Sequence, residues 1–197
     1  MLRLFTILAI AVLLAATGAF IVQPGAFAAA QEPGSDAAIA EPPGTGDGPG
    51  YVWDREFDAS GFYLPTSDLV ASGWVLDHIH VGRPEDFDAW EEESMPSMIP
   101  VWIDFHHEDS PTGMGELGEY FLDTKRVRAQ GFFIEPGRFD LRALDPELNS
   151  VVISGMFHPE HFHAPGGVPS PEPSLTGGAE INGERFRNVS FTHWLGD

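Results

Sequence analysis

The chain has 197 residues and no cysteine, and its 30 Asp and Glu against 10 Lys and Arg give a formal net charge of −20. So negative a protein repels nucleic acid and anionic membrane surfaces, which argues against both as partners. The absence of cysteine excludes disulfides, thiolate chemistry and every Cys-ligated zinc, haem or iron–sulfur site.

Residues 1–30 have the pattern of a secretory signal peptide. Arg3 provides a short positive start, residues 4–22 form an apolar run, Pro24 breaks any helix, and small residues at 26–30 fit an A-x-A cleavage pattern. We therefore expect an exported protein, periplasmic or extracellular, with no membrane attachment after cleavage. The alternative is an uncleaved membrane anchor, because the run is about as long as the ~20 residues that cross a bilayer.

Residues 31–50 are rich in Pro, Gly, Ala and acidic residues and nearly free of large apolar side chains. This composition predicts a flexible linker. The folded domain is expected to span residues 51–197, where the aromatic residues begin.

The domain shows short segments rich in aromatic and β-branched residues, separated by turn residues. Many short strands at close spacing predict an all-β fold, and we expect a single antiparallel β-sandwich, jelly-roll-like, with one short helix at 84–94. In the clearest hairpin, Pro136 and Gly137 suit the second and third positions of a type II turn. The expected strands lie within 51–57, 60–65, 72–81, 99–107, 125–134, 138–144, 150–157 and 184–195.

Strand alternation predicts which side chains share a face, because residues two apart point the same way. In 101–108 it predicts a core face and an opposite face that carries Trp102, Asp104, His106 and Glu108. In 74–81 it places Trp74, Leu76, His78 and His80 together. His193 falls in line with apolar residues and is expected to be buried and hydrogen-bonded.

The stretch GMFHPEHFHAPGG, residues 155–167, places three histidines within six positions. Pro159 has no N–H and must bend the strand exit, and His161 and His163 point the same way in extended backbone. Imidazoles from such a segment can converge on one ion. We therefore predict a copper or zinc site at His158, His161 and His163, joined by His78, His80 and His106. The alternative is a set of ordinary polar histidines with separate hydrogen-bond partners.

The segment HPEHFH, residues 158–163, is similar to the H-P-x-H-x-H part of a copper-ligand motif in multicopper oxidases. His78-Ile79-His80 also resembles the paired H-x-H segments of that family. The resemblance implies copper-type ligation only, because the family's copper-ligating cysteine is absent here. The same pair followed by Glu85 resembles the first motif of the cupin family, whose later histidine motif has no counterpart in this chain.

Residues 113–118 spell G-x-G-x-x-G, which marks a dinucleotide site only between a strand and a helix of a βαβ unit. A polar loop precedes it and no helix is expected after it. We interpret it as a flexible loop and expect no nucleotide cofactor.

These features favour an exported acidic protein that binds a divalent transition metal without turnover. The alternative is a metal-free interaction module that binds carbohydrate or protein through tryptophans, with Trp102 the candidate because alternation places it opposite the core. A metal-dependent hydrolase or oxygenase ranks third, since no general base can be named.

Overall fold

The structure is a computed structural model that describes residues 50–92, 98–116 and 118–196. The predicted signal peptide and residues 31–49 of the predicted linker lie outside the described residues. Within the described ranges, no helix is long and apolar enough to cross a membrane.

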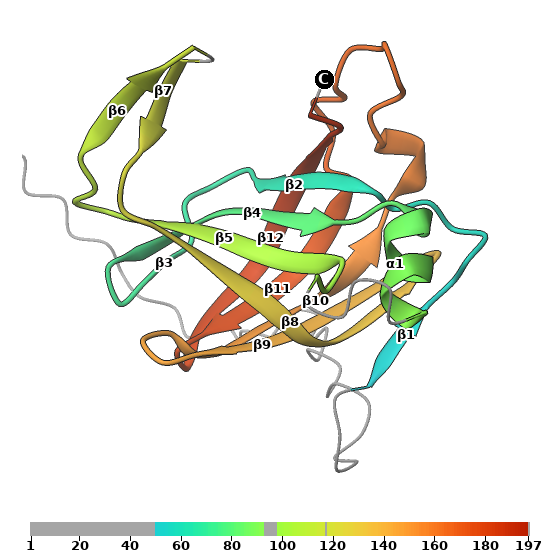
Figure 1. The fold of residues 1–197 in the computed structure, drawn as a ribbon, viewed down its shortest axis with the longest axis horizontal. Helices are drawn as coiled ribbons and strands as arrows, with labels where there is room; N and C mark the ends of the chain where they lie inside the picture. Colours follow the sequence, from blue (N-terminus) through green and yellow to red (C-terminus); the bar gives the residue numbers. More distant parts are fainter. Residues whose placement is uncertain (1–49, 93–97, 117, 197) are drawn as a thin grey trace, which may run out of the picture. The chain divides into compact units, whose positions relative to one another are not determined.

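Eight strands form a closed antiparallel barrel in which each strand pairs with the next barrel strand along the chain (Figure 1). The last strand pairs with the first, and the ring therefore has no free edge. The barrel strands are β2 (Gly61–Pro65), β4 (Trp74–Val81), β5 (Val101–His107), β8 (Thr124–Glu135), β9 (Arg138–Asp145), β10 (Asn149–Phe157), β11 (Leu175–Ile181) and β12 (Glu184–Trp194).

The prediction of an all-β domain with one short helix is confirmed, but the predicted β-sandwich is not what the structure shows. A sandwich needs two sheets, whereas here β8 pairs with both β5 and β9 and one sheet closes on itself. Strand alternation is the same in both architectures, and only the pairing of distant strands distinguishes them.

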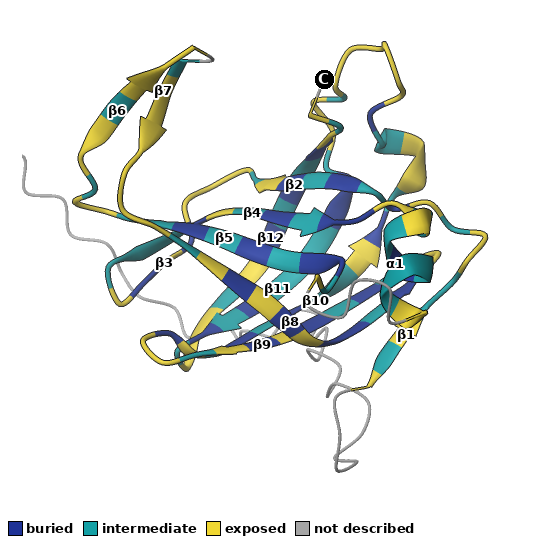
Figure 2. Cartoon of the chain, in the orientation of Figure 1, coloured by how far each residue is buried: buried dark blue, intermediate teal, exposed yellow. Residues whose placement is uncertain are grey.

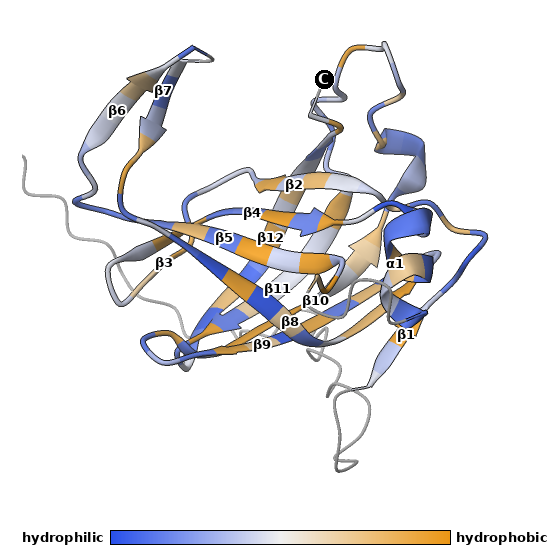
Figure 3. Cartoon of the chain, viewed as in Figure 1, coloured by the Kyte–Doolittle hydropathy of each residue, from blue (hydrophilic) through white to orange (hydrophobic). Residues whose placement is uncertain are grey.

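The barrel is filled by apolar side chains from the inward-facing positions of its strands. Phe105, Phe139 and Phe191 are at most 1% exposed, and the buried positions alternate with exposed ones along most strands (Figure 2). The same alternation appears as hydrophobic and hydrophilic positions in Figure 3. The lumen of an eight-stranded barrel is just wide enough to be filled by side chains.

Shorter elements attach to the barrel. β1 (Tyr51–Trp53) pairs in parallel with β8, and β3 (Val70–Ala71) pairs with β4. The helix α1 (Pro84–Glu91) buries Phe87, which stacks on Trp53 with ring centroids 4.6 Å apart. This helix lies within the predicted range 84–94, of which residues 93 and 94 are not described.

Each of the eight predicted segments contains a strand, and the turn at 135–138 joins β8 to β9 with Gly137 at φ 76°. The short strand β3, the strand β11 and the hairpin of β6 and β7 were not predicted. β11 contains Gly177-Gly178, where its pairing with β12 shifts register, and these residues hid its strand character. The predicted flexible loop at 113–118 is wrong: it lies in a two-stranded hairpin formed by β6 (Thr112–Gly115) and β7 (Gly118–Phe121).

The Gly177→Ala variant is expected to destabilise the barrel. A Cβ at Gly177 would lie 2.0 Å from the carbonyl oxygen of Ser154 and 2.6 Å from Cα of Gly155, so β10 and β11 would have to separate. We expect the free energy of unfolding in urea to fall by about 1–3 kcal/mol, the range for overpacked sites. Gly50→Ala is the control, because nothing lies within 4 Å of its Cβ position. Equal stability of the two variants would contradict this packing.

Candidate functional site

A β-bulge at Asp77 decides which side chains of β4 face outward. Leu76 pairs with Phe105 and His78 pairs with Asp104, and Asp77 is left without a partner across the strand. The extra residue interrupts the alternation. Leu76 is buried in the core, whereas His78 lies outside the barrel. The predicted common face for Trp74, Leu76, His78 and His80 is therefore wrong.

The prediction for the neighbouring strand β5 is confirmed: Val101, Ile103 and Phe105 are 0% exposed. Their neighbours on the opposite face pair with outward residues of β4, since His78 is opposite Asp104 and His80 is opposite Trp102. We call this outer surface the histidine face. It consists of Asp77, His78, His80, Trp102, Asp104 and His106.

Asp104 is the most heavily bonded group of the histidine face. It accepts two hydrogen bonds from the Arg126 guanidinium, at 2.9 and 2.8 Å, and one from Trp102 Nε1 at 3.3 Å. His78 Nε2 lies 3.1 Å from the same carboxylate. Burial by itself would raise the pKa of Asp104, but His78 and Arg126 hold it well below its ordinary value.

Asp77 lies between two imidazoles. One of its carboxylate oxygens is 3.2 Å from His78 Nδ1, and the other is 3.7 Å from His106 Nδ1. The Asp77 side chain is 48% exposed, and the carboxylate can be approached from solvent. The His106 ring stacks on Phe121 with centroids 3.7 Å apart, and His106 Nδ1 is buried without a hydrogen-bond partner.

The two histidines of the H-x-H pair have opposite pKa shifts. Burial lowers the pKa of His78, but the Asp104 and Asp77 carboxylates outweigh burial and raise it to about 9. Burial lowers the pKa of His80 to about 4, helped by the positive charges of His78 and Arg126. His78 is therefore protonated and His80 neutral at pH 7.

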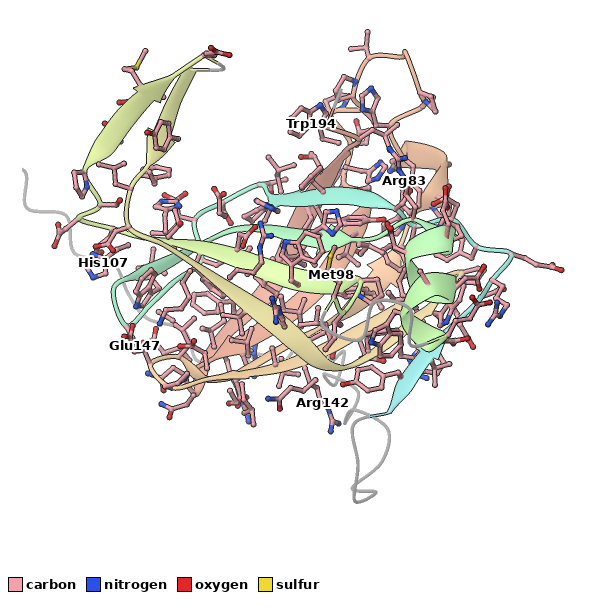
Figure 4. The ribbon with its side chains drawn as sticks, in the orientation of Figure 1. Arg83, Met98, His107, Arg142, Glu147 and Trp194 are labelled. Atoms are coloured by element: carbon pink, nitrogen blue, oxygen red, sulfur yellow. The ribbon has the colours of Figure 1, made fainter. Side chains whose placement is uncertain are left out.

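Trp102 does not present an open ring. His80 from β4 stacks on it with centroids 3.6 Å apart and planes 14° apart, and the Arg126 guanidinium from β8 lies 4.6 Å from its centroid. The aromatic row continues through Phe62 to Trp194, whose ring centroid is 5.7 Å from that of Phe62 (Trp194 is labelled in Figure 4).

The structure does not gather the rings of residues 158–163 around one point. His158 Nε2 lies 2.9 Å from Thr176 Oγ1, and His161 Nδ1 donates to the carbonyl of Pro173 at 2.8 Å. His163 is buried, donates from Nε2 to the Gly167 carbonyl, and accepts at Nδ1 from the main-chain N–H of Leu195. The ring of His158, which precedes the short 3-10 turn η1 (Pro159–His161), and the ring of His161, its last residue, have centroids 6.0 Å apart.

The prediction for His193 is confirmed. It is 2% exposed, donates from Nε2 to the carbonyl of Ser60 at 2.8 Å, and accepts at Nδ1 from the main-chain N–H of His163. Burial lowers its pKa. His193 therefore ties the loop that follows β10 to the end of β12 as a neutral structural residue.

As they stand in the part of the chain that the structure describes, no three His, Asp or Glu side chains form a group that could hold a metal ion. On the histidine face, Asp77 has its two carboxylate oxygens 3.2 Å from His78 Nδ1 and 3.7 Å from His106 Nδ1. Sequence reasoning had included both histidines but missed Asp77, because strand alternation assigns Asp77 to the side opposite His78 and only the bulge changes this.

The Asp104→Asn variant is expected to lower the pKa of His78 from about 9 toward its ordinary value near 6.5, because one of the two stabilising carboxylates is lost. A raised histidine pKa adds stability that is complete below pH 6.5 and is lost as pH rises through 9. The parent should therefore lose more stability than the variant between pH 6.5 and 9.

Ring-proton NMR titration and urea unfolding at the two pH values measure both effects. Asp140→Asn is the matched control, since Asp140 is a 15% exposed carboxylate bonded to Arg138 on a remote part of the sheet. A His78 pKa that stays near 9 in Asp104→Asn would contradict this account.

No protein-family model, curated protein or solved structure matches this chain.

Proposed function

We propose that the histidine face binds a divalent transition metal, zinc or copper, through His78 Nδ1, His106 Nδ1 and the Asp77 carboxylate. The observation that supports this is the position of Asp77, with oxygens 3.2 and 3.7 Å from the two Nδ1 atoms. Two ligand atoms that each bond a tetrahedral ion at about 2.1 Å lie about 3.4 Å apart. The two measured distances, each to a different oxygen of Asp77, lie on either side of that value.

Asp104 supports this assignment by orienting His78. Histidines that bind metals usually donate their other ring N–H to a carboxylate, which fixes the ring and raises its basicity. His78 Nε2 lies 3.1 Å from Asp104 and His78 Nδ1 lies 3.2 Å from Asp77, so each ring nitrogen is next to a carboxylate. Arg126 and Trp102 hold Asp104 in place.

The ion would replace a proton that the site already attracts. The carboxylates that stabilise the His78 imidazolium would stabilise a divalent cation in the same way. His106 is stacked flat against Phe121, and Asp77, whose side chain is 48% exposed, lies beside both imidazoles.

The 158–163 segment is the weaker candidate for the principal site. Both ring nitrogens of His163 take part in hydrogen bonds, and His161 uses Nδ1 to bond Pro173. His158 and His161 remain as a pair that could hold an ion with two imidazoles. An ion at the histidine face would be bound, buffered or handed over, and the signal-like residues 1–30 favour a role outside the cell membrane.

Titration of the untagged protein with zinc and copper should detect one principal site whose affinity depends on pH. Affinity should fall from pH 7.5 to 5.5, because ligand imidazoles must be neutral, and rise from 7.5 to 8.5, because His78 must lose a proton bound with a pKa of about 9. His78→Ala with His106→Ala should weaken binding by more than about 100-fold. Isothermal titration calorimetry measures both.

The double variant His158→Ala with His161→Ala serves as the matched comparison, and His107→Ala controls for removal of a neighbouring imidazole. Loss of binding only in the 158/161 variant would move the site to that loop and refute the histidine face. Unchanged uptake in both double variants would refute metal binding through the predicted histidines.

A further inference from the structure

The hairpin of β6 and β7, which we call the β6–β7 arm, carries exposed apolar side chains. In Figure 1 its two strands rise away from the barrel between β5 and β8, and most of its surface is exposed in Figure 2. Met114 is 79% exposed, Tyr120 53% and Leu122, just after the arm, 55%. An isolated two-stranded hairpin is marginally stable in water. The exposed apolar side chains on its surface therefore indicate an interaction site.

The glycines of the G-x-G-x-x-G stretch explain the shape of the arm. Gly113 pairs with Tyr120, and a Cβ at Gly113 would lie 2.8 Å from the Tyr120 ring and 3.2 Å from Leu122. Gly115 is also next to this ring, at 3.4 Å. The aromatic ring therefore lies over main chain that bears no side chain, and Tyr120 and Leu122 form a flat apolar surface.

The arm offers a partner unpaired strand edges. Among the described residues, β6 and β7 pair only with each other, which leaves one outer edge on each strand. Such edges accept an additional strand through main-chain hydrogen bonds, while side-chain contacts set the specificity.

The charge around the arm determines which partner fits. Residues 108–124 contain no Lys or Arg. His107, labelled in Figure 4, lies at the end of β5 beside the base of the arm. The acidic residues of this stretch are Glu108, Asp109, Glu116, Glu119 and Asp123.

We propose that the β6–β7 arm docks an extended, basic segment of a partner protein, in which Lys or Arg alternates with apolar residues. The segment adds a strand to the arm, its apolar residues cover Tyr120 and Leu122, and its cations meet the surrounding carboxylates. A second copy of this chain is disfavoured because each copy carries a net charge of −20, and an anionic membrane is disfavoured for the same reason.

The test uses the full chain and a fluorescent eight-residue peptide that alternates Lys and Val. The parent should bind this peptide and not the matching peptide of Glu and Val, and binding should weaken as salt rises from about 0.05 to about 0.5 M. Tyr120→Ala with Leu122→Ala should weaken binding at least tenfold with net charge unchanged. Fluorescence anisotropy measures the affinities.

Leu144→Ala is the matched control, because Leu144 is 60% exposed on barrel strand β9 and its variant has the same net charge. Equal affinity of the parent and the Tyr120/Leu122 variant would show charge attraction alone and overturn the proposal, as would no binding by the parent. Light scattering detects dimers of the parent, and a sedimentation assay detects binding to vesicles of phosphatidylcholine and phosphatidylserine. If the parent does not bind the peptide but forms dimers or binds vesicles through Tyr120 and Leu122, the arm binds that occupant instead.

Discussion

Closure of the barrel is the constraint on which the rest of the structure depends. Pairing of β8 with β9 and of β12 with β2 removes every edge from the ring and turns the inward positions into one apolar core. Phenylalanines such as Phe105, Phe139 and Phe157 fill that core, and the Asp, Glu, Lys and Arg side chains of the described barrel strands lie outside it, while the polar His193 is buried. A functional site on the barrel strands is therefore expected on the outer face of the barrel, where neighbouring side chains partly bury the polar groups.

The bulge at Asp77 shows how such a face is made. It restores Leu76 and Ile79 to the core although three positions separate them, and it exposes both Asp77 and His78 on the other side. Without the extra residue, either the apolar residues before it or those after it would point to solvent. The bulge thus keeps the apolar side chains on both sides of Asp77 in the core and places the Asp77 carboxylate next to the imidazoles of His78 and His106.

The sequence predicts the strands well because each barrel strand is half-buried, and alternation is a local property. It predicts the faces of β5 and the burial of His193 for the same reason. The closure, the bulge and the environment of Arg126 depend on residues far apart in the chain, such as the 22 positions between Asp104 and Arg126. A glycine-rich strand such as β11 has too few side chains to show a pattern. The emphasis on residues 158–163 came from their closeness in sequence, yet the 3-10 turn at Pro159 directs those rings to different hydrogen-bond partners.

The histidine face contacts the β6–β7 arm through His106 and Phe121. Phe121, at the end of β7, stacks on His106 with planes only 3° apart, and Asp77 is 3.7 Å from the same imidazole. A segment that binds the arm and shifts β7 would therefore also move the His106 ring, which we propose as a metal ligand. By thermodynamic linkage, the bound ion would change the affinity of the arm for its partner by the same factor as the partner changes the affinity for the ion. Stacking against Phe121 makes His106 the residue through which the two proposed sites would be coupled.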